Sequence, residues 1–122
     1  AILTSIFAMM KNGDHAVFQS DLYGGTFHAV INELPRYGME YTMVDAAIPE
    51  NFMKAIRPET RVIYIETPSN PTLKITDISA VSSIAKAHGI TTIIDNTFAS
   101  PVNQNPIDLR SGKVHFGYLS LF

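Results

Sequence analysis

The sequence predicts an α/β domain in which a layered, mainly parallel sheet is covered by helices. Short apolar runs rich in β-branched residues alternate with segments whose apolar residues recur at helical spacing. Strands joined by helices run parallel and cross over right-handed, which places the helices on the faces of the sheet. Polar motifs follow three of the runs, after Gln19, Ile65 and Ile94. The carboxyl ends of parallel strands meet at one rim, where such sheets hold ligands.

Four strands and four helices are expected. The strands are predicted at residues 16–19, 41–44, 62–65 and 91–94. The helices are predicted at residues 1–12, 26–34 and 49–56, and from an Asp77 cap to His88. Gly13, Gly38 and Gly89 are expected to end helices, and so are Pro35 and Pro58.

Two loops at the rim have unusual backbone requirements. The glycine pair Gly24-Gly25 follows the first strand, and it allows positive φ and close approach of the backbone to a ligand. The loop at 66–72 contains two prolines, which favour extended or turn conformations and leave open a cis bond at Asn70-Pro71. The loop with the two prolines is therefore predicted to have a fixed shape at the rim.

Composition excludes several classes of function. The 122 residues include 46% apolar and 16% charged residues, which is typical of one globular domain. With a net charge of −2 and no basic cluster, neither nucleic acid nor membrane is favoured as a partner. The absence of cysteine excludes thiolate chemistry, and the four scattered histidines lack metal-ligand spacing. No signal peptide is recognised, so a cytoplasmic location is expected.

The chemistry of the rim favours a flat, cationic aromatic ligand. Neither Gly-rich phosphate motif is present, and no Gly-x-Ser-x-Gly nucleophile turn occurs. The rim instead offers the Tyr23 ring, the Asn70 amide, the Asp95 carboxylate and the Thr97 hydroxyl. An aromatic ring can stack on such a ligand, and a carboxylate can keep its ring nitrogen protonated. Glu66 is interpreted as a structural acid and is left outside the site.

Three motifs resemble signatures of one enzyme family. Residues 21–26 (Asp-Leu-Tyr-Gly-Gly-Thr), 66–74 (Glu-Thr-Pro-Ser-Asn-Pro-Thr-Leu-Lys) and 95–98 (Asp-Asn-Thr-Phe) are similar, in order and spacing, to the Cys/Met-metabolism PLP-dependent enzymes. That family includes cystathionine γ-synthase, cystathionine β- and γ-lyases, methionine γ-lyase and O-acetylhomoserine sulfhydrylase. The resemblance extends from Ala1 to about Leu109. It implies part of the PLP-binding large domain of the aspartate-aminotransferase type.

The resemblance also implies roles for individual residues toward pyridoxal 5'-phosphate (PLP). Tyr23 matches the tyrosine that stacks on the pyridine ring and assists proton transfers, which makes it the candidate catalytic residue. Asn70 matches the amide near the phenolic oxygen of the cofactor. Asp95 matches the aspartate that pairs with the pyridine nitrogen, and Thr97 matches the residue on the other face of the ring. The family further implies a homotetramer acting on small amino-acid substrates.

The sequence departs from the family pattern toward both ends. The phosphate-binding Ser-Gly-Met turn is expected just before Ala1, and the Ser-x-Thr-Lys segment with the Schiff-base lysine is expected to end near Ser120. Residues 110–122 diverge from that pattern, and Lys113 lies too early to take the role. Residues 1–122 are therefore interpreted as a partial domain, cut at both ends and inactive alone. Whether the parent is a C–S lyase or a γ-replacement synthase stays open.

A non-catalytic signalling module of the receiver type is the alternative, because 122 residues is a natural length for it. Such a module needs a pair of acids after its first strand and a lysine after its last. Here only Asp21 follows the first strand, and Asp95 comes one strand too late. The enzyme interpretation is therefore preferred.

Overall fold

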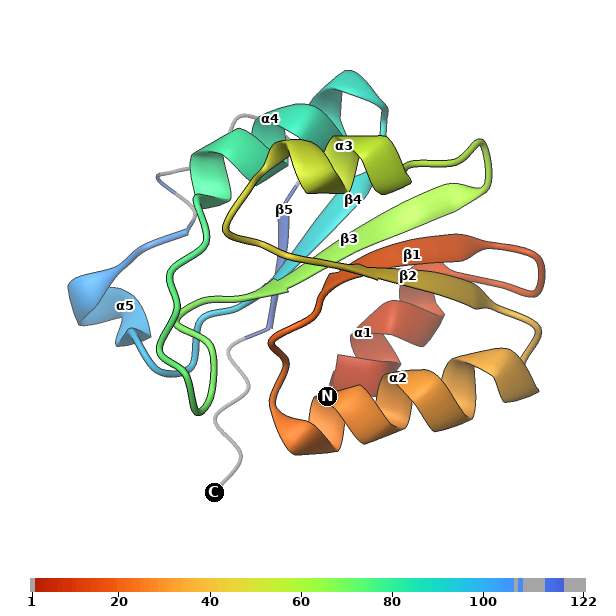
Figure 1. The fold of residues 1–122 in the computed structure, drawn as a ribbon, viewed down its shortest axis with the longest axis horizontal. Helices are drawn as coiled ribbons and strands as arrows, with labels where there is room; N and C mark the ends of the chain where they lie inside the picture. Colours follow the sequence, from red (N-terminus) through yellow and green to blue (C-terminus); the bar gives the residue numbers. More distant parts are fainter. Residues whose placement is uncertain (1, 107, 109–113, 118–122) are drawn as a thin grey trace.

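A computed structural model describes residues 2–106, 108 and 114–117. Its centre is a five-stranded parallel sheet in the order β2-β1-β3-β4-β5, with helices on both faces (Figure 1). The predicted layered α/β architecture is confirmed. The elements are α1 (Ile2–Met9), β1 (His15–Gln19), α2 (Gly24–Arg36), β2 (Glu40–Val44), α3 (Glu50–Ala55), β3 (Thr60–Glu66), α4 (Ile78–Ala87), β4 (Thr91–Asp95), α5 (Ser100–Asn103) and β5 (Val114–Gly117).

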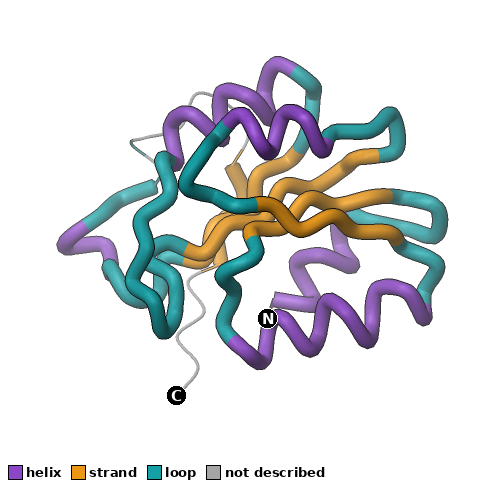
Figure 2. The backbone as a smooth tube through the Cα atoms, viewed as in Figure 1, coloured by secondary structure: helices purple, strands orange, loops and turns teal. Residues whose placement is uncertain are grey.

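The two faces of the sheet bury separate apolar clusters. Helices α1 and α2 lie on one face, and α3 and α4 lie on the other (Figure 2). Alternation along β3 divides its side chains between the faces: Tyr64 joins the cluster under α1 and α2, whereas Ile63 and Ile65 join the cluster under α3 and α4. Burial on both faces explains why β3 reads as a continuous apolar run.

The predicted glycine signals follow helix ends at Gly38 and Gly89, whereas α1 ends at Met9, four residues before Gly13. Gly13, Gly38 and Gly89 have φ of 87°, 69° and 67°, in the left-handed region that glycine adopts without steric cost. Asp77 caps α4, because its carboxylate accepts the backbone N–H of Ala80 at 2.9 Å. Both ends of α4 were therefore correctly predicted, whereas the end of α1 was predicted three residues too late, at residue 12.

The boundaries of α2 were predicted wrongly. The helix already begins at Gly24, so Gly24 and Gly25 form its first turn and are absent from the positive-φ glycines of the described residues. It also continues through Pro35 to Arg36. Pro35 lacks a backbone donor and its ring opposes the carbonyl four residues earlier, and the helix ends one residue after it, at Arg36.

Two short elements were not predicted. The helix α5 follows the Asp95 motif, and β5 pairs in parallel with β4, with Val114 opposite Thr92 and Gly117 opposite Asp95. Lys113 and Ser120, which the sequence analysis considered, lie outside the described residues. In the described part of the chain, no helix combines the length and the apolar character needed to cross a membrane.

Candidate cofactor-binding site

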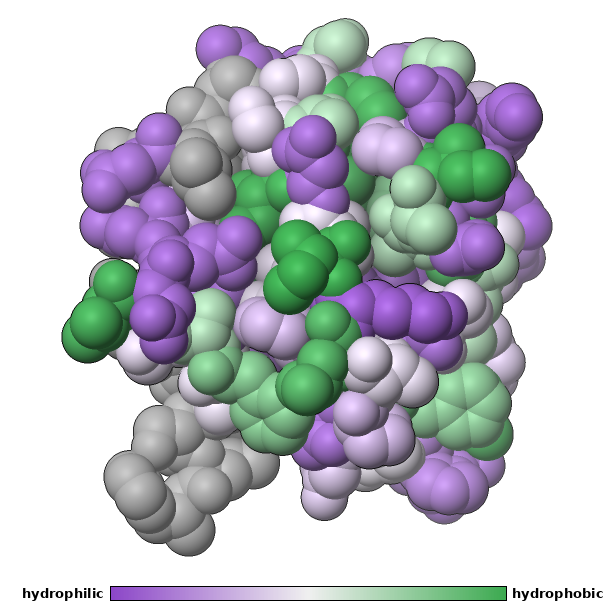
Figure 3. Space-filling view, turned by 60° about the vertical axis from the view of Figure 1, so that its left-hand side comes forward, coloured by the Kyte–Doolittle hydropathy of each residue, from purple (hydrophilic) through white to green (hydrophobic). Residues whose placement is uncertain are grey.

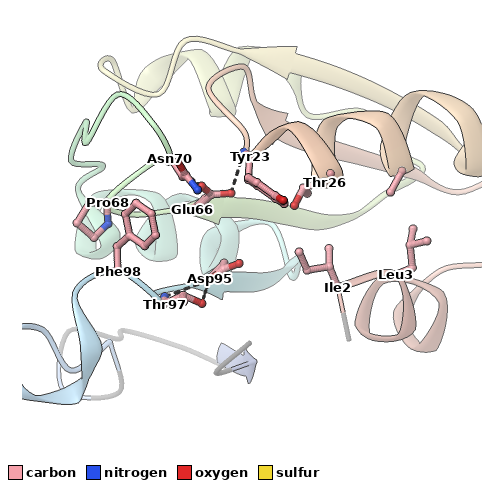
Figure 4. Close-up of a pocket in the computed structure, with 12 residues that line it drawn as sticks. Ile2, Leu3, Tyr23, Thr26, Glu66, Pro68, Asn70, Asp95, Thr97 and Phe98 are labelled. Atoms are coloured by element: carbon pink, nitrogen blue, oxygen red, sulfur yellow. Dashed lines mark hydrogen bonds between the residues drawn. The ribbon is translucent and has the colours of Figure 1, made fainter. Parts of the chain in front are cut away.

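A pocket of about 480 Å³ opens where the carboxyl ends of β3 and β4 meet the start of α2 (Figure 4). The four residues that sequence analysis assigned to the site all line it, although they come from three separate motifs. The complete lining is Ile2, Leu3, Tyr23, Gly25, Thr26, Ala29, Glu66, Pro68, Asn70, Asp95, Thr97 and Phe98. The three motif loops therefore converge on one cavity.

Asp95 is the last residue of β4, and its side chain is held by two neighbours. Its Oδ1 accepts both the backbone N–H of Thr97, at 3.0 Å, and the Thr97 hydroxyl, at 2.6 Å. Its Oδ2 accepts the Tyr64 hydroxyl at a longer 3.5 Å. Thr97 thus fixes the orientation of the carboxylate, and Oδ2 is the oxygen with more capacity to accept a ligand proton.

Tyr64 acts as a donor to Asp95 rather than as an acid. Burial raises the pKa of the Tyr64 phenol well above 10, and the charges of Asp95 and Glu66 raise it further. The phenol therefore keeps its proton. The Thr26 hydroxyl lies close to Tyr64 and also lines the pocket, but it has no hydrogen-bond partner of normal geometry among the described residues.

Tyr23 occupies the position before α2, and 52% of the residue is exposed. Its ring lies against Gly25: a Cβ added to Gly25 would be 2.7 Å from Cε1 of Tyr23. A Cβ added to Gly24 would have no neighbour within 4 Å. The close approach predicted for the glycine pair is therefore present at Gly25, and it serves the tyrosine ring.

Asn70 lies in the loop between β3 and α4. The peptide bonds Thr67-Pro68 and Asn70-Pro71 are both cis, as the sequence left open for the second. The loop is tied to the end of β4, because the backbone N–H of Thr67 donates to the carbonyl of Asp95 at 2.9 Å. The Asn96 side chain also donates to the Thr67 carbonyl. These bonds keep Asn70 and Asp95 at the same edge of the sheet.

Glu66 accepts structural hydrogen bonds, as the sequence analysis expected, but it also lines the pocket, which the sequence analysis did not expect. It is 5% exposed and lines the pocket, and its carboxylate accepts the backbone N–H groups of Tyr23 and Asn70. Burial raises the pKa of Glu66; the two backbone hydrogen bonds lower it, and the nearby Asp95 raises it. The available signal was its position as an acid at the carboxyl end of a buried apolar run, as for Asp95.

Lys74 is exposed, and its ammonium group pairs with a carboxylate on the loop after β1. Its Nζ lies 2.6 Å from Oδ2 of Asp21, which raises the pKa of the lysine. The pair joins the loop after β1 to the loop after β3. Because Lys74 is exposed, solvent screens this attraction, and its contribution to stability is small.

Apolar side chains form the remaining walls and the surface around the pocket. Ile2, Leu3, Pro68 and Phe98 line it (Figure 4). A neighbouring face of the molecule carries hydrophobic side chains among hydrophilic ones (Figure 3). A few charged and amide groups between apolar walls are typical of sites for small organic ligands. Within the described residues, no group of three or more His, Asp or Glu side chains is placed to hold a metal ion.

Comparison with known proteins identifies relatives along most of the chain. Residues 1–113 match the family described as Cys/Met metabolism PLP-dependent enzyme. Cystathionine beta-lyase MetC of Bacillus subtilis is 48% identical over 89% of this chain and 28% of its own length. The crystal structure of cystathionine gamma-lyase from Lactobacillus plantarum complexed with L-serine has 44% identity and a TM-score of 0.86, covering 93% of this chain and 30% of that one.

A third relative extends the range of reactions. The structure of O-acetylhomoserine sulfhydrylase from Wolinella succinogenes has 32% identity and a TM-score of 0.80, covering 84% of this chain and 29% of that one. The fold is accordingly that of the large domain of PLP-dependent enzymes of the aspartate-aminotransferase type. The chain belongs to the Cys/Met metabolism PLP-dependent enzyme family, which removes the receiver alternative. It spans less than a third of the length of these relatives.

Proposed function

We propose that this pocket binds the ring of PLP, with Asp95 at the pyridine nitrogen and Tyr23 on a face of the ring. The observation that carries this proposal is the convergence of Tyr23, Asn70, Asp95 and Thr97 on one cavity from three separate loops. An ionised carboxylate beside the nitrogen keeps that nitrogen protonated. When bound, PLP in this state withdraws electrons from the α-carbon of an amino-acid substrate.

The residues of the pocket fit such a ligand. Oδ2 of Asp95 retains acceptor capacity, and the Thr26 hydroxyl is a buried donor or acceptor without a partner of normal geometry among the described residues. Ile2 and Leu3 of α1 add an apolar wall to the pocket. A carboxylate oxygen and a hydroxyl are therefore present for polar atoms of the ligand, with apolar walls beside them.

Roles follow for the other residues. Asn70 supplies an amide near the phenolic oxygen of the ring, and Thr97 lies toward the face opposite Tyr23 while also orienting Asp95. The Tyr23 phenol is half-exposed at the mouth of the pocket. This position allows the phenol to move a proton between the ligand and solvent, which makes Tyr23 the catalytic residue of the described part of the chain.

The whole enzyme is proposed to act on sulfur amino acids or activated homoserine in the cytoplasm, as a homotetramer. The relatives include lyases and a sulfhydrylase. The reaction of the whole enzyme is therefore proposed to be either an elimination or a replacement. We also propose that residues 1–122 are part of a PLP-binding domain and do not catalyse the reaction alone. The supporting observation is that the family's Ser-x-Thr-Lys pattern does not occur in these residues.

The test uses pyridoxamine 5'-phosphate, which has the ring and phosphate of PLP but no aldehyde to react with surface lysines. We expect saturable binding of one equivalent in equilibrium dialysis. We expect binding to weaken by up to about tenfold in Tyr23→Ala, because aromatic stacking contributes roughly 0.5–1.5 kcal/mol. Tyr37→Ala is the matched control, since Tyr37 is 56% exposed and lies outside the pocket. Equal affinity in both variants would contradict the proposal.

A further inference from the structure

We infer that Glu66 is a positioning residue that sets the spacing between the Tyr23 ring and the Asn70 side chain, and this inference rests on the proposed function. One oxygen of its carboxylate, Oε2, accepts the backbone N–H of Tyr23 at 3.1 Å. The other, Oε1, accepts the backbone N–H of Asn70 at 2.8 Å. A single side chain therefore joins the two loops that carry the ring-stacking and amide contacts (Figure 4).

Gln19 fixes the backbone of Glu66 in turn. The side-chain oxygen of Gln19 accepts the backbone N–H of Glu66 at 2.9 Å, and its amide nitrogen donates to the carbonyl of Glu66, also at 2.9 Å. The same nitrogen donates to the carbonyl of Asp21 at 2.7 Å. Gln19 is 1% exposed, so these bonds are shielded from water. Gln19 and Glu66 together form a clamp between the ends of β1 and β3.

A carboxylate is the side chain that this geometry requires. An ionised carboxylate accepts hydrogen bonds with both oxygens, whereas an amide of the same length accepts with one atom and donates with the other. Glutamine at position 66 would therefore keep one of the two bonds and turn an NH2 group toward the other backbone N–H. Burial opposes ionisation of Glu66, as the raised pKa shows. The negative charge of Glu66 is therefore better explained by its positioning of the Tyr23 and Asn70 loops than by a contribution to the stability of the fold.

The first experiment tests the clamp without any ligand. In an NMR pH titration of the unmodified chain, we expect the amide resonances of Tyr23 and Asn70 to shift together, with one midpoint above the usual 4.5 of a glutamate. The two shifts should disappear in Glu66→Gln and persist in Glu50→Gln, an exposed acid in the first turn of α3. Separate midpoints for the two amides in the unmodified chain would overturn the clamp, whether or not the variant folds.

The second experiment tests whether the clamp acts through the cofactor contacts. We expect Glu66→Gln to weaken binding of pyridoxamine 5'-phosphate by about tenfold, since one charge-assisted hydrogen bond is lost. Glu50→Gln should bind as the unmodified chain does. In a double-mutant cycle with Tyr23→Ala, the combined loss should be smaller than the product of the two single losses.

Each outcome has a distinct meaning. Multiplicative losses in the cycle would show that Glu66 acts independently of the Tyr23 ring and would overturn the inference. If the amides titrate together but the unmodified chain binds no pyridoxamine 5'-phosphate, the proposed function fails. The role of Glu66 toward the cofactor then fails with it, while the joined loops remain as a structural fact.

Discussion

Thr97 donates its backbone N–H and its side-chain hydroxyl to the same oxygen of Asp95, at 3.0 and 2.6 Å. The two bonds form because Thr97 lies two residues beyond Asp95, at the turn where the chain leaves β4. They hold one oxygen of the carboxylate and leave the other toward the pocket. Thr97 therefore has a task in orienting the anion in addition to its proposed place beside the ring.

Thr97→Val is expected to weaken binding of pyridoxamine 5'-phosphate by about tenfold. Valine keeps the shape of threonine but removes the hydroxyl, and a hydrogen bond to a charged group contributes roughly 1.5–3 kcal/mol. Thr91→Val, at the other end of β4, is the control and should leave the affinity unchanged. The measurement is a binding isotherm, and equal affinities for the two variants would show that the hydroxyl does not orient Asp95.

Gly25→Ala is expected to displace the Tyr23 ring and to weaken the same binding by up to about tenfold, since one stacked aromatic pair contributes roughly 0.5–1.5 kcal/mol. The new Cβ would lie 2.7 Å from Cε1 of Tyr23, and the exposed ring is the group that can move. Gly24→Ala is the matched control, because its Cβ meets open space. Both variants should keep or gain stability, since alanine is up to about 1 kcal/mol better than glycine in a helix. Equal binding by both would refute this role of Gly25.

His15 is expected to make stability depend on pH. The imidazole is 1% exposed, and its nitrogens lie 2.8 Å from the Thr60 hydroxyl and 2.9 Å from the Thr42 hydroxyl. Burial and then the charge of Arg57 lower the pKa of His15 in the fold. A lowered pKa means that the unfolded chain takes up the proton first. The contribution of His15 to the free energy of unfolding is therefore fully present above about pH 6.5, and it is lost as the pH falls toward the lowered pKa of His15 in the fold.

Urea unfolding at several pH values between about 7.5 and 5 measures this effect. In the unmodified chain, the free energy of unfolding should decrease as the pH is lowered. The same decrease is expected in His88→Gln, the control variant, because His88 is exposed. The fall should be smaller in His15→Gln. A His15→Gln variant whose stability falls as steeply as that of the unmodified chain would contradict the prediction.

Glu66 is expected to make stability decrease as the pH rises, which is opposite to the effect of His15, over a neighbouring pH range. Burial raises the pKa of Glu66 above 4.5 in the fold. Its contribution to the free energy of unfolding is therefore fully present below pH 4.5 and is lost as the pH rises through the raised pKa. The stability of the unmodified chain relative to Glu66→Gln should therefore decrease as the pH rises. Denaturant titrations of both, with Glu50→Gln as a variant whose relative stability stays constant, provide the measurement. An increase would mean that the two backbone hydrogen bonds outweigh burial.

The architecture could be predicted from sequence because its signals are local. Buried parallel strands appear as short β-branched runs, and the polar residues at their ends, such as Asp95, mark the rim. The start of α2 was missed because a glycine pair is compatible with both a turn and a helix start. Strand β5 was missed because its four residues owe their conformation to pairing with β4 rather than to a local pattern.

The part of the site that escaped prediction depends on contacts between distant residues. The task of Glu66 is defined by backbone N–H groups of Tyr23 and Asn70, and no property of its own segment reveals them. The same holds for Tyr64, whose apolar surroundings identify it as a core residue although its hydroxyl donates to Asp95. Side chains at the rim can be predicted from strand ends, whereas the groups that orient them require the tertiary structure.

The most direct test of the proposed function pairs Asp95→Asn with a ligand analogue that has carbon in place of the ring nitrogen. The unmodified chain should bind pyridoxamine 5'-phosphate at least about tenfold more tightly than the analogue, because a charged pair at the nitrogen contributes more than 1.4 kcal/mol. In Asp95→Asn this preference should largely disappear, whereas Asp45→Asn, an exposed acid after β2, should retain it. An undiminished preference in Asp95→Asn would contradict the assignment of Asp95 to the ring nitrogen.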